Sequence, residues 1–461
     1  MWTPNPPDDP GVVTTSNITT SSMTVSWVNA TNEIGYAVYR STDGGVTYSW
    51  VTNIPQNVTT YNATGLLANT QYNWRIYSYR ESISAPVDGS GTTLPSGKFF
   101  TIANGNWSNP AIWNTNSVPG SQDSAEVSVG NNVVLDAATQ ACGTLIVKGN
   151  LTYWSATANQ TLTVNGDVIV DASGNFNAGT GTGNVGTTVG FILNIGGSAA
   201  TSTLAGNLIV DGILDLSTTA EVQTVFYGTQ SATVTGTGAT CELPFITVNK
   251  GLIDNTLEFL RTYTQPSASN YTNSQRLAVL GGTLKISAPV VTTSFHSFSL
   301  TLAQGINSRL WLNNAGISLG MRPGVLNAGT MQLQGEVRVD AGSLTVGTGS
   351  NNHFATTNGV LRINGGTVTV YGGLQLVAIA SSQLIVTGGR LLIDPQDLQN
   401  LSNFTNILSI PATSSFTFTG GSIEIIDPHS IAPTSTTIAS INIQSGGSRV
   451  ITGGRDRKSV V

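Results

Sequence analysis

The sequence has 461 residues and a formal net charge of −6, and only 9% of its residues are charged, against roughly a quarter in an ordinary soluble domain. Its hydrophobic fraction of 39% supports a continuous apolar core and excludes the composition of a disordered chain. No run of Lys and Arg occurs before the last few residues, so nucleic acid and acidic membrane surfaces are not expected as partners.

The two ends of the sequence carry no visible targeting signal. Residues 1–7 do not resemble a secretory signal, and no apolar stretch approaches the roughly eighteen residues of a membrane-spanning helix, so we expect no membrane insertion. Residues 455–461 differ from the rest in charge and pattern, and residues 456–461, back-translated, match a common sequencing adapter. We therefore expect a non-native tail and a chain truncated at both ends, so that export and anchor signals are missing from view.

Residues 10–93 consist of short alternating segments separated by turn residues, which is typical of an antiparallel β-sandwich. Residues 23–27 and 36–40 are two such segments. The turn signal at residues 43–45 then precedes two aromatic residues, Tyr48 and Trp50.

A corner pattern identifies the kind of sandwich. Trp27 lies on the expected second strand, and Leu66, Thr70 and Tyr72 fit an L-x-P-x-T-x-Y corner in which Ala68 replaces the usual Pro. With these residues, the stretch from about 8 to 95 resembles a fibronectin type III domain. The resemblance implies structural roles for Trp27 and for Tyr72, whose hydroxyl would bond back to the backbone. We assign residues 1–95 to this domain.

Three tyrosines of this domain form a candidate binding strip. If the residues around Trp74 face inward, Tyr77 and Tyr79 cannot both face the core, and Tyr39 could join them on the surface. Exposed aromatic rings stack on sugars or on a protein partner. The alternative is that they only pack against a neighbouring domain or shield the sheet.

A linker of small residues at 92–97 precedes a second unit that starts near Lys98. From there the chain repeats one pattern: a few alternating residues, a Gly or Asn-Gly, then a few more, without any segment of helical period. Such a strand pair cannot bury its apolar face alone but can do so when stacked on copies of itself. We therefore predict an all-β chain in which residues 141–454 form a right-handed parallel β-helix, or solenoid, with coils of twenty-odd residues.

Two glycine pairs carry this prediction most clearly. The stretches TGGRLLIDP and TGGSIEIIDP echo one another, and we expect Gly388, Gly389, Gly420 and Gly421 to form corners that need positive φ or close backbone approach. The alternative architecture, a string of further sandwiches, would show a repeat of about ninety residues with Trp and Tyr landmarks, and none follows residue 79.

Residues 96–140 are predicted to form the linker and N-terminal cap of the β-helix. Trp107 and Trp113 are bulky enough to cover the open apolar end of the first coil, with a ligand-binding role as the alternative. The G-x-W-x-x-P-x-x-W pattern around them, and residues 226–250, resemble large bacterial β-strand-repeat surface proteins, many exported by the type IX route. The resemblance implies an adhesin-like cell-surface protein, although the C-terminal sorting domain of that group is not present.

The sequence contains no catalytic motif, and no catalytic residue is assigned. Turn aspartates on neighbouring repeats are candidate Ca²⁺ ligands, with ordinary turn chemistry as the alternative; they are Asp167, Asp171, Asp211 and Asp215. Cys142 and Cys241 either form a disulfide or are two small buried side chains.

These observations favour a secreted or cell-surface structural protein: a stiff β-helix stalk that displays a binding module to an extracellular glycan or protein surface, without catalysis. One alternative is a β-helix polysaccharide lyase or glycoside hydrolase with an accessory fibronectin type III domain. That enzyme would bring three or more charged side chains together in one groove. A second alternative is a glycan-binding protein that uses Tyr39, Tyr77 and Tyr79.

Overall fold

The computed structural model separates the chain into two compact units. The first contains Met1–Phe99 and Pro119–Ala125, and the second contains Phe100–Val118 and Glu126–Val461. The structure describes residues 6–68, 70–93, 97–154, 159–179, 184–185, 188–217, 220–265, 277–292, 307–321, 329–347, 352–395, 406–426, 439–452 and 455–459.

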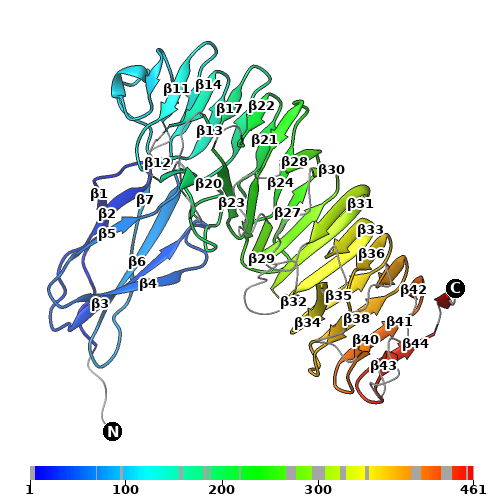
Figure 1. The fold of residues 1–461 in the computed structure, drawn as a ribbon. Helices are drawn as coiled ribbons and strands as arrows, with labels where there is room; N and C mark the ends of the chain where they lie inside the picture. Colours follow the sequence, from blue (N-terminus) through cyan, green and yellow to red (C-terminus); the bar gives the residue numbers. More distant parts are fainter. Residues whose placement is uncertain are drawn as a thin grey trace, which may run out of the picture. The chain divides into compact units, whose positions relative to one another are not determined.

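The first unit is a sandwich of two antiparallel sheets (Figure 1). A three-stranded sheet contains β1 (Thr14–Ser16), β2 (Ser22–Ser26) and β5 (Thr60–Thr64). A four-stranded sheet contains β4 (Ser49–Pro55), β3 (Gly35–Ser41), β6 (Gln71–Tyr79) and β7 (Val87–Thr92).

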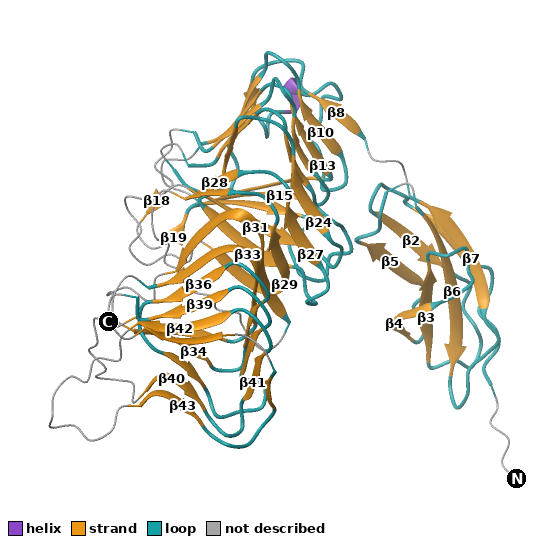
Figure 2. Cartoon of the chain, turned by 90° about the vertical axis from the view of Figure 1, so that its right-hand side faces the viewer, coloured by secondary structure: helices purple, strands orange, loops and turns teal. Residues whose placement is uncertain are grey.

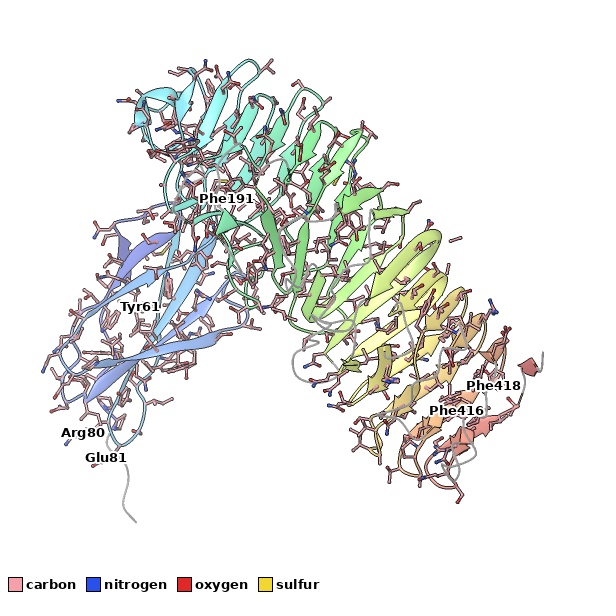
Figure 3. The ribbon with its side chains drawn as sticks, in the orientation of Figure 1. Tyr61, Arg80, Glu81, Phe191, Phe416 and Phe418 are labelled. Atoms are coloured by element: carbon pink, nitrogen blue, oxygen red, sulfur yellow. The ribbon has the colours of Figure 1, made fainter. Side chains whose placement is uncertain are left out.

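Aromatic side chains fill the space between these two sheets. Trp27 is buried and meets Tyr36 edge to face at 5.3 Å between ring centroids. Trp74 is fully buried, and the partly buried Tyr61, labelled in Figure 3, packs against the core. At the corner before β6, the backbone N–H of Leu67 donates to the Tyr72 hydroxyl at 2.7 Å. The side chains that carried the sequence resemblance therefore form the core and the corner of the sandwich.

The strands of the second unit pair mostly in parallel, and from β11 to β28 each repeat of the chain adds one strand to each of three sheets in the same order (Figures 1 and 2). The eight-stranded sheet contains β9 (Gly105–Asn106), β11 (Asn132–Leu135), β14 (Asn150–Tyr153), β17 (Asn175–Asn177), β22 (Ile213–Asp215), β25 (Thr240–Glu242), β28 (Tyr263–Gln265) and β30 (Val290–Thr292). The second, here named the β12 sheet, contains β12 (Thr139–Cys142), β15 (Gln160–Val164), β20 (Phe191–Ile195), β23 (Val222–Tyr227), β26 (Phe245–Asn249) and the start of β29 (Leu277–Ile286).

The third sheet of the second unit, here named the β13 sheet, extends from the first repeats to the last. Its first strands are β13 (Thr144–Val147), β16 (Val168–Val170), β21 (Leu208–Val210), β24 (Ala232–Thr235), β27 (Thr256–Phe259), the end of β29, β31 (Ser308–Met321) and β33 (Glu336–Val346). Two parallel rows follow β33: β35 (Val360–Ile363), β38 (Gln383–Val386), β41 (Ser415–Phe418) and β44 (Arg449–Ile451), and β36 (Thr367–Val370), β39 (Arg390–Ile393), β42 (Ser422–Ile426) and β45 (Arg455–Ser459).

A separate five-stranded parallel sheet is formed by strands that alternate in the sequence with those of the last two rows. It contains β32 (Gly329–Leu333), β34 (Asn352–Thr356), β37 (Leu374–Leu376), β40 (Asn406–Ile410) and β43 (Ala439–Ile443). The remaining elements are β8 (Lys98–Phe100), the 3₁₀ turn Pro110–Ile112, β10 (Ser124–Val127), β18 (Asn184–Val185) and β19 (Thr188–Val189).

Side chains alternate along these strands between a buried and a half-buried face. β13 and β39, for example, both bury their second and fourth residues. Aromatic rings stack in the apolar interior: Tyr153 of β14 lies 5.8 Å from Phe176 of the next strand in its sheet and 5.1 Å from Phe191 of the β12 sheet, labelled in Figure 3. Where one face of a strand is buried in this way, a slip of one residue would turn the core outward, so the pairing register is strongly specified.

The glycine pairs lie at corners where the backbones of neighbouring repeats approach closely. Gly389 and Gly421 have φ of 68° and 78°. A Cβ at Gly388 would lie 2.3 Å from the Asn364 carbonyl oxygen, and one at Gly420 would lie 2.3 Å from the Thr387 carbonyl oxygen. The second glycine of each pair supplies the positive φ, and the first allows the close approach.

A comparison of Gly389→Ala with Gly130→Ala should separate the cost of positive φ from the cost of close backbone approach. Gly130 has a similar φ of 81° but open space around its position, whereas a Cβ at Gly389 would lie 2.6 Å from backbone atoms of the preceding repeat. We expect Gly130→Ala to cost about 1–2 kcal/mol from φ alone, and Gly389→Ala to cost about 1–3 kcal/mol more. Urea unfolding followed by circular dichroism measures both, and equal midpoints would refute the close approach.

Lys250 follows β26 and is fully buried. Its Nζ donates to three backbone carbonyl oxygens, those of Ala205 at 2.6 Å, Tyr227 at 2.8 Å and Gln230 at 3.0 Å. Burial lowers the pKa of Lys250 to about 8. The ammonium group uses all three of its donors on backbone carbonyl oxygens, so the buried charge is fully hydrogen-bonded.

The variant Lys250→Met keeps the apolar stem and removes the donors. Each hydrogen bond from a charged donor contributes about 1.5–3 kcal/mol, and its loss is partly offset because a buried charge is also removed. We expect a net loss of about 2–4 kcal/mol of unfolding free energy, measured by urea unfolding. Exposed Lys98→Met is the control, and equal stability of both variants would contradict the bracing role.

Near the start of the second unit, Trp107 and Trp113 are both buried and meet edge to face at 5.0 Å. The Trp113 indole N–H donates to the Trp107 carbonyl oxygen at 3.0 Å, so the pair forms one rigid cluster. Cys142 and Cys241 are also buried, and no disulfide joins them. Of the two alternatives for the cysteines, the structure shows the small buried side chains.

Candidate functional site

The four candidate calcium ligands each accept hydrogen bonds from nearby turns. Asp167 accepts from the backbone and side-chain N–H of Asn207 at 2.8 and 3.0 Å, and Asp211 accepts from the backbone N–H and hydroxyl of Thr237 at 2.8 and 3.0 Å. The other two accept from backbone N–H groups two residues on: Asp171 from Ser173 and Asp215 from Ser217.

The paired residues Val170 and Val210 place Asp171 and Asp211 at the same corner of successive repeats. Asp167 comes before β16 and Asp215 ends β22, so the four carboxylates do not share one corner. Within the described ranges, no group of three or more His, Cys, Asp and Glu is arranged to hold a metal ion. The geometry is that of turn-stabilising aspartates.

The three candidate tyrosines lie on the outer face of the four-stranded sheet and are half-buried. Tyr39 and Tyr77 meet edge to face at 5.5 Å. Tyr79 packs over Gly35, where an added Cβ would lie 2.5 Å from the tyrosine hydroxyl. Tyr39 and Tyr77 therefore bury part of their surface against each other, and Tyr79 buries part of its surface against Gly35 of β3.

Trp50 is the aromatic residue that this face exposes most. It is the cross-strand partner of Tyr39 and is 59% exposed. Its indole N–H donates to Asn53 Oδ1 at 3.2 Å. The alternation of β4 after the 43–45 turn could have pointed to Trp50, but a β-bulge shifts the register beside Tyr39, and alternation alone does not show that shift.

A second candidate surface, here called the charged ladder, lies on neighbouring strands of the β13 sheet. Its members come from β27, β29, β31, β33 and β35: Glu258, Lys285, Arg309, Trp311, Glu336, Arg338, Asp340 and Arg362. Sequence reasoning missed it because the partners are a whole repeat apart; Arg309 and Glu336, for example, are separated by 27 positions. Opposite charges spaced by one repeat length are the signal that could have found it.

Glu336 is the centre of one half of the charged ladder. Its two carboxylate oxygens accept separately from Arg309 Nε and Arg362 Nε, each at 2.7 Å. Burial alone would raise the pKa of Glu336, but the hydrogen bonds from the two guanidinium groups outweigh it and hold that pKa below its ordinary value. The carboxylate therefore joins strands β31, β33 and β35 as an anion.

Trp311 is the centre of the other half. Lys285 Nζ lies 4.5 Å and Arg338 Cζ lies 4.0 Å from the centre of the indole ring, and the indole N–H donates to Asp340 Oδ2 at 2.9 Å. Arg338 in turn binds Asp340 at 2.7 Å, and Lys285 binds Glu258 at 2.8 Å. Cation–π contacts and ion pairs thus link four successive strands.

The chemistry available at the charged ladder is electrostatic. Burial would raise the pKa values of Glu258 and Asp340 too, but hydrogen bonds from their partners keep both below the ordinary value. A general acid must hold a proton near the working pH, and these three carboxylates are ionised there. The arrangement stabilises the stacking of strands and shows no general acid among its own carboxylates.

Acid should weaken this stacking. The folded-state pKa of Glu336 is lower than that of the unfolded chain, near 4.3, so its stabilisation is complete above the unfolded value and is lost as pH falls through the folded one. We expect Glu336→Gln to cost about 2 kcal/mol at pH 7 and progressively less between about pH 5 and pH 3. Urea midpoints across this range test it, with exposed Asp254→Asn as the control. A cost independent of pH would contradict the role of the charge.

Of the histidines, the structure describes His353. His353 is buried, and its Nδ1 accepts from the Gly373 backbone N–H at 2.9 Å, while His296 and His429 lie outside the described residues. The described part of the chain also contains no helix with the length and apolar character that a membrane span requires.

Two family models match parts of the chain. The fibronectin type III domain model matches residues 6–90, and the G8 domain model matches residues 112–237. A fibronectin type III domain is therefore present at the N-terminus, followed by a G8 domain at the start of the parallel sheets. Domains of both kinds are typical of extracellular and cell-surface proteins. No curated protein matches the chain.

Solved structures are similar to part of the chain. A redesigned β-sandwich protein is 26% identical and covers 19% of this chain and 90% of its own, with a TM-score of 0.18. The FN3tt crystal structure is 23% identical and covers 20% of this chain and 98% of its own, with a TM-score of 0.18. The chicken CNTN1 FN1-FN3 domains are 18% identical and cover 22% of this chain and 38% of their own, with a TM-score of 0.19.

Proposed function

We propose that the chain is a secreted or cell-surface structural protein in which a right-handed parallel β-helix stalk displays the fibronectin type III module for adhesion. The observation that carries the proposal is the order of pairing: successive repeats from β11 to β28 return to the same three sheets, and later repeats continue the β13 sheet beside a new five-stranded parallel sheet. In the proposed β-helix each repeat is one coil, and the Trp107 and Trp113 cluster caps its first coil.

The composition supports this proposal. A stack of parallel strands derives its stiffness from main-chain hydrogen bonds, so it needs few surface charges, and the chain has 9% charged residues. The fibronectin type III and G8 matches support an extracellular setting. The resemblance to bacterial β-strand-repeat proteins adds the hypothesis of a bacterial adhesin of the type IX-exported kind.

A carbohydrate-active enzyme is the second candidate. The observation that favours it is the charged ladder, in which charged side chains converge on one sheet. Their mutual pairing and the lowered carboxylate pKa values favour a stabilising role instead. If the enzyme proposal holds, Asp171→Asn or Asp211→Asn, or Glu336→Gln, abolishes turnover of a polysaccharide.

Adhesion and turnover can be measured on the same preparation. We expect beads coated with the full chain to bind intact cells, and plant and microbial polysaccharides incubated with the chain to gain no reducing ends. Beads coated with an unrelated fibronectin type III protein are the control. If the chain turns over a polysaccharide and any of the three substitutions above abolishes that turnover, the enzyme proposal replaces the adhesion proposal. If the coated beads bind no cell surface, the adhesion proposal is wrong.

A further inference from the structure

The outer face of the four-stranded sheet in the first unit exposes a large aromatic ring in an ordered setting. Tyr36, Val38, Trp74 and Ile76 face the core. Trp50 pairs with Tyr39, so its side chain lies on the opposite face, where it is 59% exposed. An indole combines a flat apolar surface with a polar N–H, and Trp is enriched at binding interfaces for that reason.

Two features hold this ring in place. The β-bulge between Val38 and Tyr39 pairs Tyr39 with Trp50 and Ala37 with Asn53, so Trp50 and Asn53 share the outer face although they are three residues apart. The indole N–H then donates to Asn53 Oδ1 at 3.2 Å. This bond restrains the rotation of the ring and reduces the conformational entropy that a ligand would have to remove.

The surroundings of Trp50 provide polar groups without excess charge. The half-buried Tyr39 and Tyr77 form an aromatic floor beside it. Arg75 lies over the Tyr48 ring at 4.0 Å and binds Asp88 through two hydrogen bonds of 2.7 and 2.8 Å, so this guanidinium is neutralised. A ligand for this face needs a flat apolar side and uncharged hydrogen-bonding groups.

We propose that this face binds a neutral polysaccharide, with the Trp50 ring stacked on the C–H face of a pyranose and the Asn53 amide and Tyr39 hydroxyl available to sugar hydroxyls. A sugar ring has the size and amphipathic character that a single indole platform accepts. A stable protein interface needs about 800 Å² from each partner around a well-buried apolar centre. On this face the strongly exposed aromatic surface is one indole, because Tyr39 and Tyr77 are already half-buried and contact each other.

This inference deepens the proposed adhesive function, on which it rests, by naming the ligand class and the contact residue. The test compares the full chain with three variants. Trp50→Ala removes the platform, and Trp154→Ala is the matched control, because Trp154 lies in the second unit and is 58% exposed. Trp50→Phe keeps a smaller aromatic ring and should retain part of the binding.

Binding is measured by affinity electrophoresis in gels that contain soluble β-glucan, xylan or mannan, with unfolding midpoints recorded for every variant. We expect the wild type and Trp154→Ala to be retarded equally by at least one of these glycans, and Trp50→Ala to lose at least tenfold in affinity with an unchanged midpoint. Equal retardation of Trp50→Ala, or no retardation of the wild type by any of the three, would overturn the inference.

The coated-bead assay separates this inference from the proposed function. If the beads bind cells and Trp50→Ala beads bind them equally well, adhesion stands and the saccharide platform is wrong. If wild-type beads bind no cell surface while the chain still binds a neutral glycan through Trp50, the platform stands and the adhesive function is wrong.

Discussion

Parallel pairing between successive repeats is the constraint on which the second unit depends. A strand such as β38 buries one face and pairs with the equivalent strands of the repeats before and after it, so a change in one repeat affects both neighbouring repeats. The close backbone contacts at Gly388 and Gly420 follow from this pairing, because a corner must fit onto the corner of the repeat before it. Lys250 adds a side-chain link to this stacking, because its ammonium group donates to three backbone carbonyl oxygens of earlier segments.

Much of this architecture could be predicted from the sequence. Trp27 and Tyr72 identified the fibronectin type III sandwich, which the family match confirms, and alternating segments without helical period predicted an all-β chain. These signals are local, because a few neighbouring residues in the sequence are enough to indicate a corner or an alternating strand. The parallel pairing of the glycine-rich repeats was also predictable, because stacked copies are the way for such strands to bury their apolar faces.

The candidate sites were harder to predict, because their members meet across strands. Tyr39, Tyr77 and Tyr79 were identified by alternation, but the ring that this face exposes most is Trp50, which a β-bulge in the partner strand brings beside Tyr39. The charged ladder was missed for a related reason: Trp311 and Asp340 are separated by 29 positions, and nothing near either residue indicates the other. The pairing register between distant strands determines which side chains meet on both surfaces. Composition and short motifs do not reveal that register.

The unequal length of the repeats has an evolutionary consequence. Val368 pairs with Leu391, and Leu391 pairs with Ile423, so repeats of clearly different length keep the same ladder. Because the entropic cost of a longer surface connection grows slowly, extra residues can be accepted between two strands without disturbing the stack. Such a framework can gain, lose or exchange whole loops while its backbone stays the same, and new recognition segments can arise on it without a new fold.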